Sequence, residues 1–364
     1  MELRCERDVL VEALGTATRA VATRGGSLPV LSGVRAALTG NQLVLTGSDL
    51  DLTISVSVEV AGLSDGVAVL PARLAADIVR ALEPGAVHLE AEGEEARISA
   101  GRSQFSVRLL PADDFPRLPE NPADEVTLDA AQLHDALRQV VRAASSDDAR
   151  PILTGVLMAA EGDGLRLVAT DSYRLAVRDL RGASVLREGQ AVLVPSKALG
   201  ELARVLSGAE TVTLRLAERD ATFEVGGTTL TTRLIEGEFP NYRQLIPSSH
   251  PNRLTVGREP LLDALRRVKL LAREASPVRI ALRADGIELT ATTQDVGQAQ
   301  EDLDAKYEGT EMVIAFNPEY LADGIEAITG DEVTLETVDA LKPAVVRSVE
   351  GAEYLYLLMP VRVS

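Results

Sequence analysis

Apolar residues recur at helical spacing near the start of the chain. Leu10, Leu14, Ala17 and Val21 are three or four positions apart, so they would share one face of an amphipathic helix. The pattern occurs three times, as DVLVEAL at 8–14, AQLHDAL at 131–137 and EPLLDAL at 259–265. The last leucines of these segments are separated by 123 and 128 residues. A recurrence over so long a period predicts three copies of one structural unit.

Two proline landmarks follow each helical segment in the same order. The first prolines lie in SLPVLSGVRAAL at 27–38, ARPILTGVLMAA at 149–160 and ASPVRIALRADG at 275–286. The second lie in VLPARLAADIVRAL at 69–82, LVPSKALGELARVL at 193–206 and FNPEYLADGIEAI at 316–328. The two landmarks are 42, 44 and 41 residues apart in the three copies. Because proline is well tolerated in the first turn of a helix, each second landmark predicts a second helix, with Leu74, Ile78 and Leu82 facing a core.

The remainder of each copy alternates between apolar and polar residues. Segments such as QLVLTGSDLDLTISVSVEV, AVHLEAEGEEARISA and TVTLRLAERDATFEV predict antiparallel strands that end at Gly, Asp or Asn turns. The fold class is therefore expected to be α+β, with two helices packed on antiparallel sheets in each repeat. The stretches LPENPADE and PSSHPN have the composition of linkers. The expected repeats are accordingly 1–120, 121–250 and 251–364.

Charge is distributed unevenly between the expected helices and the rest of the chain. The net charge is −18, which argues against nucleic acid if taken as a total. Five of the six expected helices, over 8–24, 71–82, 131–144, 195–207 and 259–274, nevertheless carry +4 together, and everything else carries −22. The sixth, at 318–329, carries −3, which makes it an unlikely contact for DNA. If three repeats close into a ring with the basic helices inside, phosphates would be attracted only to the hole. Solvated helix faces with balanced charges are an equally good interpretation of the pattern alone.

Signals of other protein classes are missing from the sequence. The N-terminus MELRCERDVL is charged where a signal peptide needs apolar residues, and no segment is long and apolar enough for a membrane span, so a cytoplasmic protein is expected. There is no phosphate-binding GxxxxGK[ST] loop and no GxGxxG motif. Cys5 is the single cysteine, and His88, His134 and His250 are isolated, so no metal, cofactor or catalytic residue is expected and the protein is expected not to be an enzyme.

Specific motifs resemble those of a known family across essentially the whole chain. Beside the threefold repeat these are LPARLAADIVRAL, GRSQFSVRLLPADDFPRL, VATDSYRLAV, EGEFPNYRQLIP and the terminal YLLMPVR. They resemble the bacterial beta sliding clamp, the beta subunit of the replicative DNA polymerase III holoenzyme. The resemblance implies a head-to-tail homodimer of six repeats that encircles double-stranded DNA without sequence specificity and acts as a polymerase processivity factor. It also implies a cleft that binds short peptides of the replicative DNA polymerase, the clamp loader and repair polymerases.

The resemblance carries the peptide cleft onto particular positions. Apolar side chains there would receive apolar peptide residues, with methionine adaptable to several partners, and Arg and Asn would hold peptide carbonyls. The implied cleft residues are Arg150, Thr170, Ser172, Tyr173, Arg174, Leu175, Pro240, Leu245, Asn317, Tyr320, Pro343, Leu357, Met359, Pro360, Val361 and Arg362.

DNA contacts are implied on the expected inner helices. The resemblance points first to Arg24 and Arg73. Others plausible on the facing helices are Arg80, Arg138, Arg142, Lys197 and Arg204. These would hold the duplex only weakly, because a topologically linked protein needs few phosphate contacts and no base readout.

Two alternatives remain open from the sequence. One is a paralogous clamp specialised for repair polymerases or for resistance to a clamp-binding inhibitor. The other is a repeat scaffold unrelated to DNA, which would leave the TDSYRL and MPVR matches without an explanation.

Overall fold

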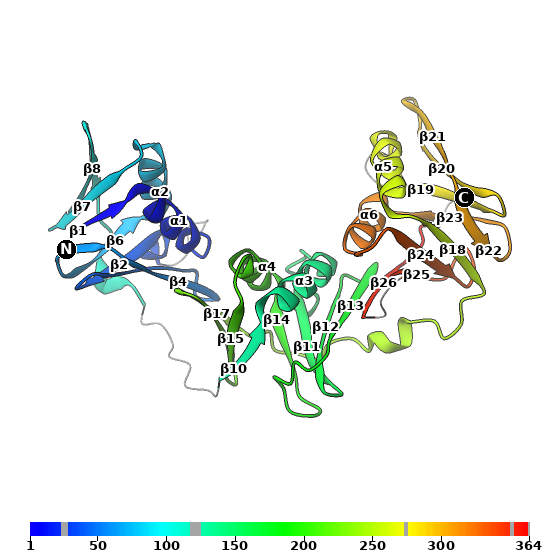
Figure 1. The fold of residues 1–364 in the computed structure, drawn as a ribbon, viewed down its shortest axis with the longest axis horizontal. Helices are drawn as coiled ribbons and strands as arrows, with labels where there is room; N and C mark the ends of the chain where they lie inside the picture. Colours follow the sequence, from blue (N-terminus) through cyan, green and yellow to red (C-terminus); the bar gives the residue numbers. More distant parts are fainter. Residues whose placement is uncertain (23–27, 117–124, 273–275, 350–352, 363–364) are drawn as a thin grey trace. The chain divides into compact units, whose positions relative to one another are not determined.

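The computed structural model describes residues 1–22, 28–116, 125–272, 276–349 and 353–362 (Figure 1). Its contacts divide the chain into two compact units. Unit 1 consists of Met1–Ala131 with Glu201–Leu234, and unit 2 consists of Gln132–Gly200 with Ile235–Ser364. The middle repeat of the sequence therefore contributes to both units.

Unit 1 contains two antiparallel sheets. Its five-stranded sheet has the order β5-β1-β7-β8-β9, and its eight-stranded sheet has the order β10-β15-β16-β17-β4-β3-β2-β6. The strands of the first sheet are β1 (Glu2–Glu6), β5 (Ala61–Ser64), β7 (Ala86–Glu92), β8 (Glu95–Ala100) and β9 (Ser103–Arg108). Those of the second are β2 (Gly33–Thr39), β3 (Gln42–Ser48), β4 (Leu52–Glu59), β6 (Gly66–Pro71), β10 (Glu125–Asp129), β15 (Thr211–Leu216), β16 (Asp220–Val225) and β17 (Thr228–Arg233).

Two helices of unit 1 pack together over the sheets. They are α1 (Arg7–Thr18) and α2 (Ala72–Ala81), and α1 also packs on β3 and β4. The approach is close at Gly47 of β3, where a Cβ atom would lie 2.1 Å from the carbonyl oxygen of Ala17. Glycine at this position therefore lets the helix lie directly on the sheet. The short 3₁₀ helices η1 (Pro29–Ser32) and η2 (Ala112–Asp114) complete the helical segments of the first repeat.

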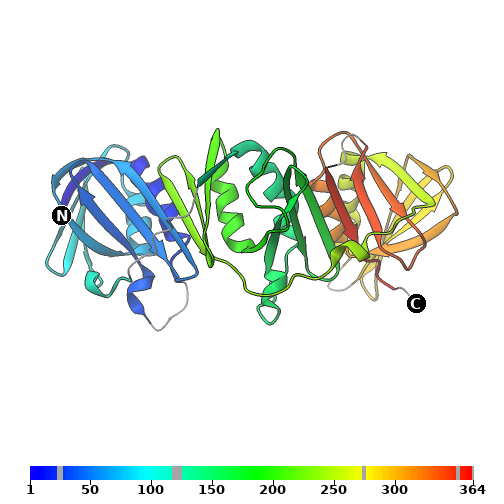
Figure 2. The same ribbon diagram turned by 90° about the horizontal axis from the view of Figure 1, so that it is seen from below.

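Unit 2 is built around a nine-stranded sheet that joins strands of the second and third repeats. Its order is β14-β11-β12-β13-β26-β25-β24-β18-β22, and Figure 2 shows the green strands continuing into the red ones. The strands are β11 (Gly155–Glu161), β12 (Gly164–Thr170), β13 (Arg174–Leu180), β14 (Ala191–Pro195), β18 (Asn252–Gly257), β22 (Ala305–Glu308), β24 (Glu332–Thr337), β25 (Ala344–Ser348) and β26 (Tyr354–Leu358). A four-stranded sheet, β21-β20-β19-β23, contains β19 (Val278–Arg283), β20 (Gly286–Thr293), β21 (Gly297–Leu303) and β23 (Met312–Phe316).

The helices of the second and third repeats complete the structure. They are α3 (Ala130–Val140), α4 (Ser196–Leu206), α5 (Arg258–Val268) and α6 (Pro318–Glu326). The 3₁₀ segments are η3 (Val141–Ala143), η4 (Pro151–Thr154), η5 (Tyr242–Leu245) and η6 (Lys269–Leu271). Helix α5 packs on α6 and on β20 and β21, and α6 packs on β26.

The predicted pattern of two helices and antiparallel strands in each repeat is confirmed, with corrections at individual positions. The first helix of each repeat is shorter than expected. For example, α1 ends at Thr18 rather than near residue 24. Only Pro318 lies in the first turn of a second helix, whereas Pro71 and Pro195 end the preceding strands. Leu74 was expected in a core, but it is 52% exposed, because α2 buries Ala75 and Ile78 instead.

Candidate functional site

The pairing of β13 with β26 creates an apolar centre in unit 2. Leu175 and Leu357 are cross-strand partners, and both are buried. They belong to a cluster with Val168, Val177, Val345 and Tyr242, against which Leu157, Phe239, Ile246 and Leu355 pack. Tyr242 comes from η5, so a segment about 65 residues beyond β13 closes one side of the cluster. The cluster is therefore assembled from strands and a loop that are far apart in sequence.

The turn between β12 and β13 is held by its own side chains. Oδ1 of Asp171 accepts from the backbone N–H groups of Tyr173 at 2.9 Å and Arg174 at 3.0 Å. Thr170 Oγ1 donates to the carbonyl of Arg174 at 2.7 Å. Ser172 has a φ of 81°, a left-handed conformation that non-glycine residues adopt rarely. Tyr173, in the same turn, is 58% exposed.

The C-terminal tail runs along this turn. The backbone N–H of Met359 donates to the carbonyl of Tyr173 at 2.9 Å, and that of Val361 donates to the carbonyl of Ala315 at 2.7 Å. The tail is thus tied both to the TDSYRL turn and to β23. Met359 keeps 38% of its surface exposed, beside exposed Tyr173. Two apolar side chains therefore lie open to solvent next to a closed apolar cluster.

Arg174 is a buried arginine at the centre of the site. Its Nε donates to Asp171 Oδ2 at 3.0 Å, and its Nη1 donates to Asp323 Oδ2 at 2.5 Å. The guanidinium carbon also lies 4.2 Å from the centroid of the Tyr320 ring, in a cation–π geometry. These contacts hold Arg174 against α6, so its guanidinium is engaged within the chain.

Tyr356 connects β26 to the same helix. Its hydroxyl donates to the backbone carbonyl of Tyr320 at 2.7 Å. Burial raises the pKa of the Tyr356 phenol above its usual range. A Cβ atom added at Gly324 of α6 would lie 2.3 Å from the Tyr356 ring, so the helix packs directly onto that ring.

Other implied cleft residues have structural contacts of their own. Asn317 caps α6, since its Oδ1 accepts from the N–H groups of Glu319 at 2.9 Å and Tyr320 at 3.2 Å. Arg150 donates to Asp147 at 3.0 Å and to the Ser172 hydroxyl at 3.2 Å, which links it to the TDSYRL turn. The remaining implied residues lie at the exposed or half-buried positions Pro240, Leu245, Pro343, Pro360, Val361 and Arg362.

Sequence reasoning missed several residues of this site. Tyr242 lies inside the quoted EGEFPNYRQLIP segment and Asp171 inside VATDSYRLAV, so the motifs themselves contained the signal. Asp323 was counted only as one of the acidic residues on the last helix. Its pairing with Arg174 depends on tertiary packing and has no signature in local sequence.

The residues implied for DNA contact lie on several helices. Arg24 lies outside the described residues. Arg73 and Arg80 are exposed on α2, and Arg80 pairs with Asp77 at 3.0 Å. Lys197 is exposed in the first turn of α4, and Arg204 of the same helix lies 3.8 Å from Glu201. Arg138 of α3 and Arg142 of η3 are exposed on consecutive turns.

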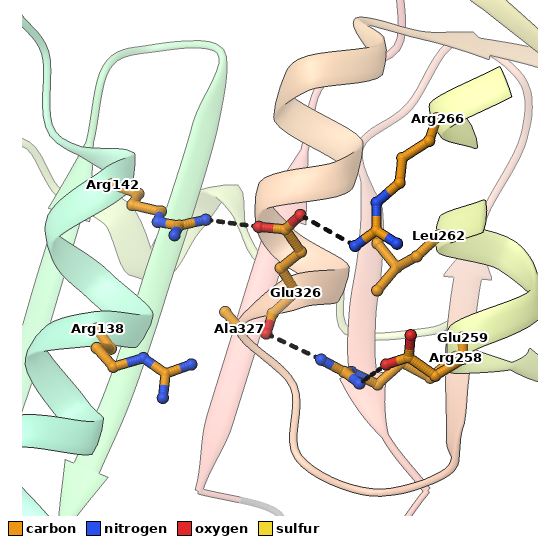
Figure 3. Close-up of a pocket in the computed structure, with 8 residues that line it drawn as sticks. All are labelled: Arg138, Arg142, Arg258, Glu259, Leu262, Arg266, Glu326 and Ala327. Carbon is orange, nitrogen blue, oxygen red and sulfur yellow. Dashed lines mark hydrogen bonds and ion pairs between the residues drawn. The ribbon is translucent and has the colours of Figure 1, made fainter. Parts of the chain in front are cut away.

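Arg138 and Arg142 line a pocket in unit 2 that Figure 3 shows in close-up. Its volume is about 340 Å³, and α5 and the end of α6 form the opposite wall. Arg142 donates to Glu326 at 2.8 Å, and this hydrogen bond raises the pKa of the Arg142 guanidinium. The full lining consists of Arg138, Arg142, Arg258, Glu259, Leu262, Arg266, Glu326 and Ala327.

The acidic helix α6 neutralises basic residues of its surroundings. Asp323 and Glu326 pair with Arg142, and Glu319 pairs with Lys269 at 2.5 Å. The charge of −3 on this helix therefore balances basic side chains of neighbouring elements.

No group of three or more His, Cys, Asp and Glu side chains is arranged to hold a metal ion in the described part of the chain. None of its helices is long and apolar enough to cross a membrane.

Comparisons with known proteins match the whole chain. Residues 1–119, 127–241 and 243–362 match models of the N-terminal, central and C-terminal domains of the DNA polymerase III beta subunit. The chain is 37% identical to the beta sliding clamp of Streptomyces coelicolor, with all of both chains covered. Its structure is similar to that of the Bartonella birtlesii sliding clamp bound to griselimycin, with a TM-score of 0.93, 32% identity and both chains fully covered. It is also similar to the C. crescentus beta sliding clamp with PEG bound to a putative tethering region, with a TM-score of 0.91 and 30% identity over 100% of this chain and 99% of the other.

Proposed function

The chain belongs to the DNA polymerase III beta subunit family, the beta sliding clamps, and we propose that three of its surfaces serve the processivity function of that family. As a sliding clamp it keeps a DNA polymerase on its template. Family membership leaves no support for a repeat scaffold unrelated to DNA.

The first proposal places partner peptides on the surface formed by the TDSYRL turn, the C-terminal tail and η5. The observation that carries it is the exposure of Tyr173 and Met359 beside the buried cluster at the β13–β26 pairing. Exposed apolar side chains next to a rigid apolar floor are suited to an extended peptide with apolar anchors. Replicative and repair polymerases and the clamp loader would bind here through such segments. The proposed residues are those implied by the sequence motifs, joined by Tyr242 and Asp171.

The second proposal places duplex DNA along the basic helices. Arg73, Arg80, Lys197 and Arg204 are exposed on α2 and α4, and Arg138 is exposed on α3. Several of these cations are balanced by acids on their own helices, such as Asp77 and Glu201. Their net attraction for phosphate is therefore weak, which suits a protein that slides on DNA without reading its sequence. We propose that the protein itself catalyses no reaction. We also propose that it is located in the cytoplasm, with the DNA.

The third proposal concerns the head-to-tail homodimer. β9 is an outer strand of the five-stranded sheet and β21 an outer strand of the four-stranded sheet. Such edges carry backbone groups that can pair with another strand. On β9 Phe105 is 39% exposed and Arg108 is exposed, while on β21 Asp302 is exposed. We propose that β9 of one copy meets β21 of its partner, with repeats 1–120, 121–250 and 251–364 alternating around the ring.

The test of the clamp function is retention on DNA of different topology. The protein would be loaded by a clamp loader onto nicked circular DNA, and its retention measured before and after the circle is cut. A topological link predicts retention on circles and loss from the free ends of the linear form. Equal retention on both forms would mean ordinary surface binding and would overturn the proposal.

A further inference from the structure

The pocket of Figure 3 concentrates cationic side chains from three elements of unit 2. Arg138 belongs to α3, Arg142 to η3, and Arg258 and Arg266 to α5. Only two acidic side chains, Glu259 and Glu326, line the same pocket. Its lining therefore has an excess of positive charge, although the whole chain is strongly acidic. Guanidinium groups match the geometry of phosphate oxygens, and arginine is over-represented where proteins bind phosphate.

The four arginines differ in how far they are engaged within the chain. Arg258 is fixed, since its Nε and Nη2 donate at 3.3 Å to the carbonyls of Ile325 and Glu326, and it also pairs with Glu259. Arg266 donates to Asp263 at 2.9 Å. Arg138 makes no hydrogen bond or ion pair with any residue in the described ranges, and Figure 3 shows its guanidinium directed toward the pocket. One arginine is thus free to bind an external anion.

Glu326 occupies the position that such an anion would take. Its Oε2 accepts from Arg142 at 2.8 Å, and its Oε1 lies 3.9 Å from Nη2 of Arg266, so one carboxylate extends between arginines of opposite walls. The carboxylate carries one negative charge and has two acceptor oxygens. A phosphate group offers at least as much charge and additional acceptor oxygens in a tetrahedral arrangement. The side chain of Glu326 is also 37% exposed, so it can turn away into solvent.

We propose that this arginine pocket is a phosphate-binding site, in which Glu326 acts as an internal carboxylate that the phosphate group displaces. Arg138 and Arg142 bind the phosphate from one wall and Arg266 from the other, while Arg258 contributes its charge from a fixed position. The assignment of the DNA backbone as the source of the phosphate rests on the proposed function. The assignment of the pocket as a phosphate site does not rest on the proposed function, because a free polyphosphate presents the same chemical group.

The test is calorimetric titration of the full-length protein with inorganic pyrophosphate at low ionic strength and without divalent metal. Arg138→Gln is the principal variant, because it removes no hydrogen bond or ion pair within the described residues and should leave folding unchanged. Loss of one charge-assisted hydrogen bond at this exposed site should weaken binding about fivefold. Glu326→Gln should strengthen it by a similar factor, because the competing charge is removed. Arg219→Gln, an exposed arginine of unit 1, is the matched control and should bind like the wild type.

The outcomes separate the pocket from the clamp function. No binding of pyrophosphate, or equal weakening by Arg138→Gln and Arg219→Gln, would overturn the pocket. Competition between pyrophosphate and a short DNA duplex would identify the DNA backbone as the source of the phosphate group. If the two do not compete, the phosphate group comes from a free phosphate compound bound at the same arginines. Retention on circular DNA is measured independently, so a working clamp with an inert pocket would be recognised as such.

Discussion

Arg174 of β13 donates to Asp323 of α6 across 2.5 Å, and this contact joins the middle repeat to the last one. The other oxygen of the same carboxylate lies 3.4 Å from Nη1 of Arg142, which lines the arginine pocket. A single carboxylate therefore contacts an arginine of the proposed peptide surface and an arginine of the proposed phosphate pocket.

We expect Asp323→Asn to weaken partner-peptide binding. The neutral amide would hold Arg174 less firmly, and Arg174 would depend on Asp171 alone for its charge pairing. Because Asp323 is partly exposed, the loss should be limited to about 1 kcal/mol. Fluorescence anisotropy with a labelled polymerase peptide measures this loss of binding affinity. Asp263→Asn removes a comparable exposed pair on α5 and should leave the affinity unchanged.

Truncation of the tail should abolish peptide binding. Met359→Ala with removal of residues 360–364 deletes an exposed apolar side chain and the segment that is tied to Ala315. The dimer should persist, because the tail is tied to Ala315 of β23, at the edge of the four-stranded sheet opposite β21. Val296→Ala, which shortens a 50% exposed apolar residue elsewhere in unit 2, is the control. Unchanged peptide affinity in the truncated protein would show that the cleft lies somewhere else.

The packing of α6 on Tyr356 should be sensitive to a single methyl group. Gly324→Ala would place its Cβ 2.3 Å from the ring, so the helix or the ring must move. Overpacking of this kind costs about 1–3 kcal/mol of unfolding free energy. Gly200→Ala on α4 meets only Val141 at 3.9 Å and should stabilise the protein slightly, because alanine favours the helix. Denaturant unfolding of the two variants checks the difference, and equal stabilities would contradict the close packing.

Buried tyrosines should make the protein less stable at alkaline pH. Burial raises the pKa of both Tyr354 and Tyr356, so the folded state keeps phenolic protons that the unfolded chain releases near pH 10. The free energy of unfolding therefore falls as the pH rises above that value. Below it, the contribution of the two tyrosines to stability does not change with pH. Tyr356→Phe loses the hydrogen bond to Tyr320 and should be about 1 kcal/mol less stable at neutral pH, with the difference narrowing above pH 10. Unfolding midpoints between pH 8 and 11, with absorbance at 295 nm, follow both effects.

A charge at the outer strand β9 should disrupt the dimer. Phe105→Asp introduces a carboxylate at a position that we expect to meet the acidic strand β21 of the partner. Sedimentation should then show a shift from dimer to monomer. Leu63→Asp lies on β5, at the opposite edge of the same sheet, and should leave the dimer intact. Dimers of equal strength in both variants would exclude the β9 edge as the seam.

Helical periodicity in the sequence located the six α-helices found in the described residues, but it did not determine their ends. The helix expected over 8–24 ends at Thr18. The apolar pattern extends beyond this end because residues such as Val21 are buried without being helical. Strand alternation predicted strands without their long-range partners. The pairing of β17 with β4 and of β13 with β26 depends on contacts across repeats, which no local pattern encodes.

The candidate site was predicted from motifs rather than from physical pattern. TDSYRL and MPVR pointed to segments that the structure does bring together, through the hydrogen bond from Met359 to Tyr173. Their ion pairs were not predictable, since Asp323 and Arg174 are 149 residues apart. The acidic charge of the last helix was recognised, but its role in neutralising Arg142 and Lys269 became apparent only in three dimensions.

The boundaries of the two large sheets do not coincide with the boundaries of the sequence repeats. The eight-stranded sheet joins strands of the first and second repeats at β17–β4, and the nine-stranded sheet joins strands of the second and third at β13–β26. A single repeat cut out at its sequence boundaries would leave these strands unpaired and prone to self-association. The pieces of this chain that can fold on their own are therefore expected to contain two joined repeats rather than one.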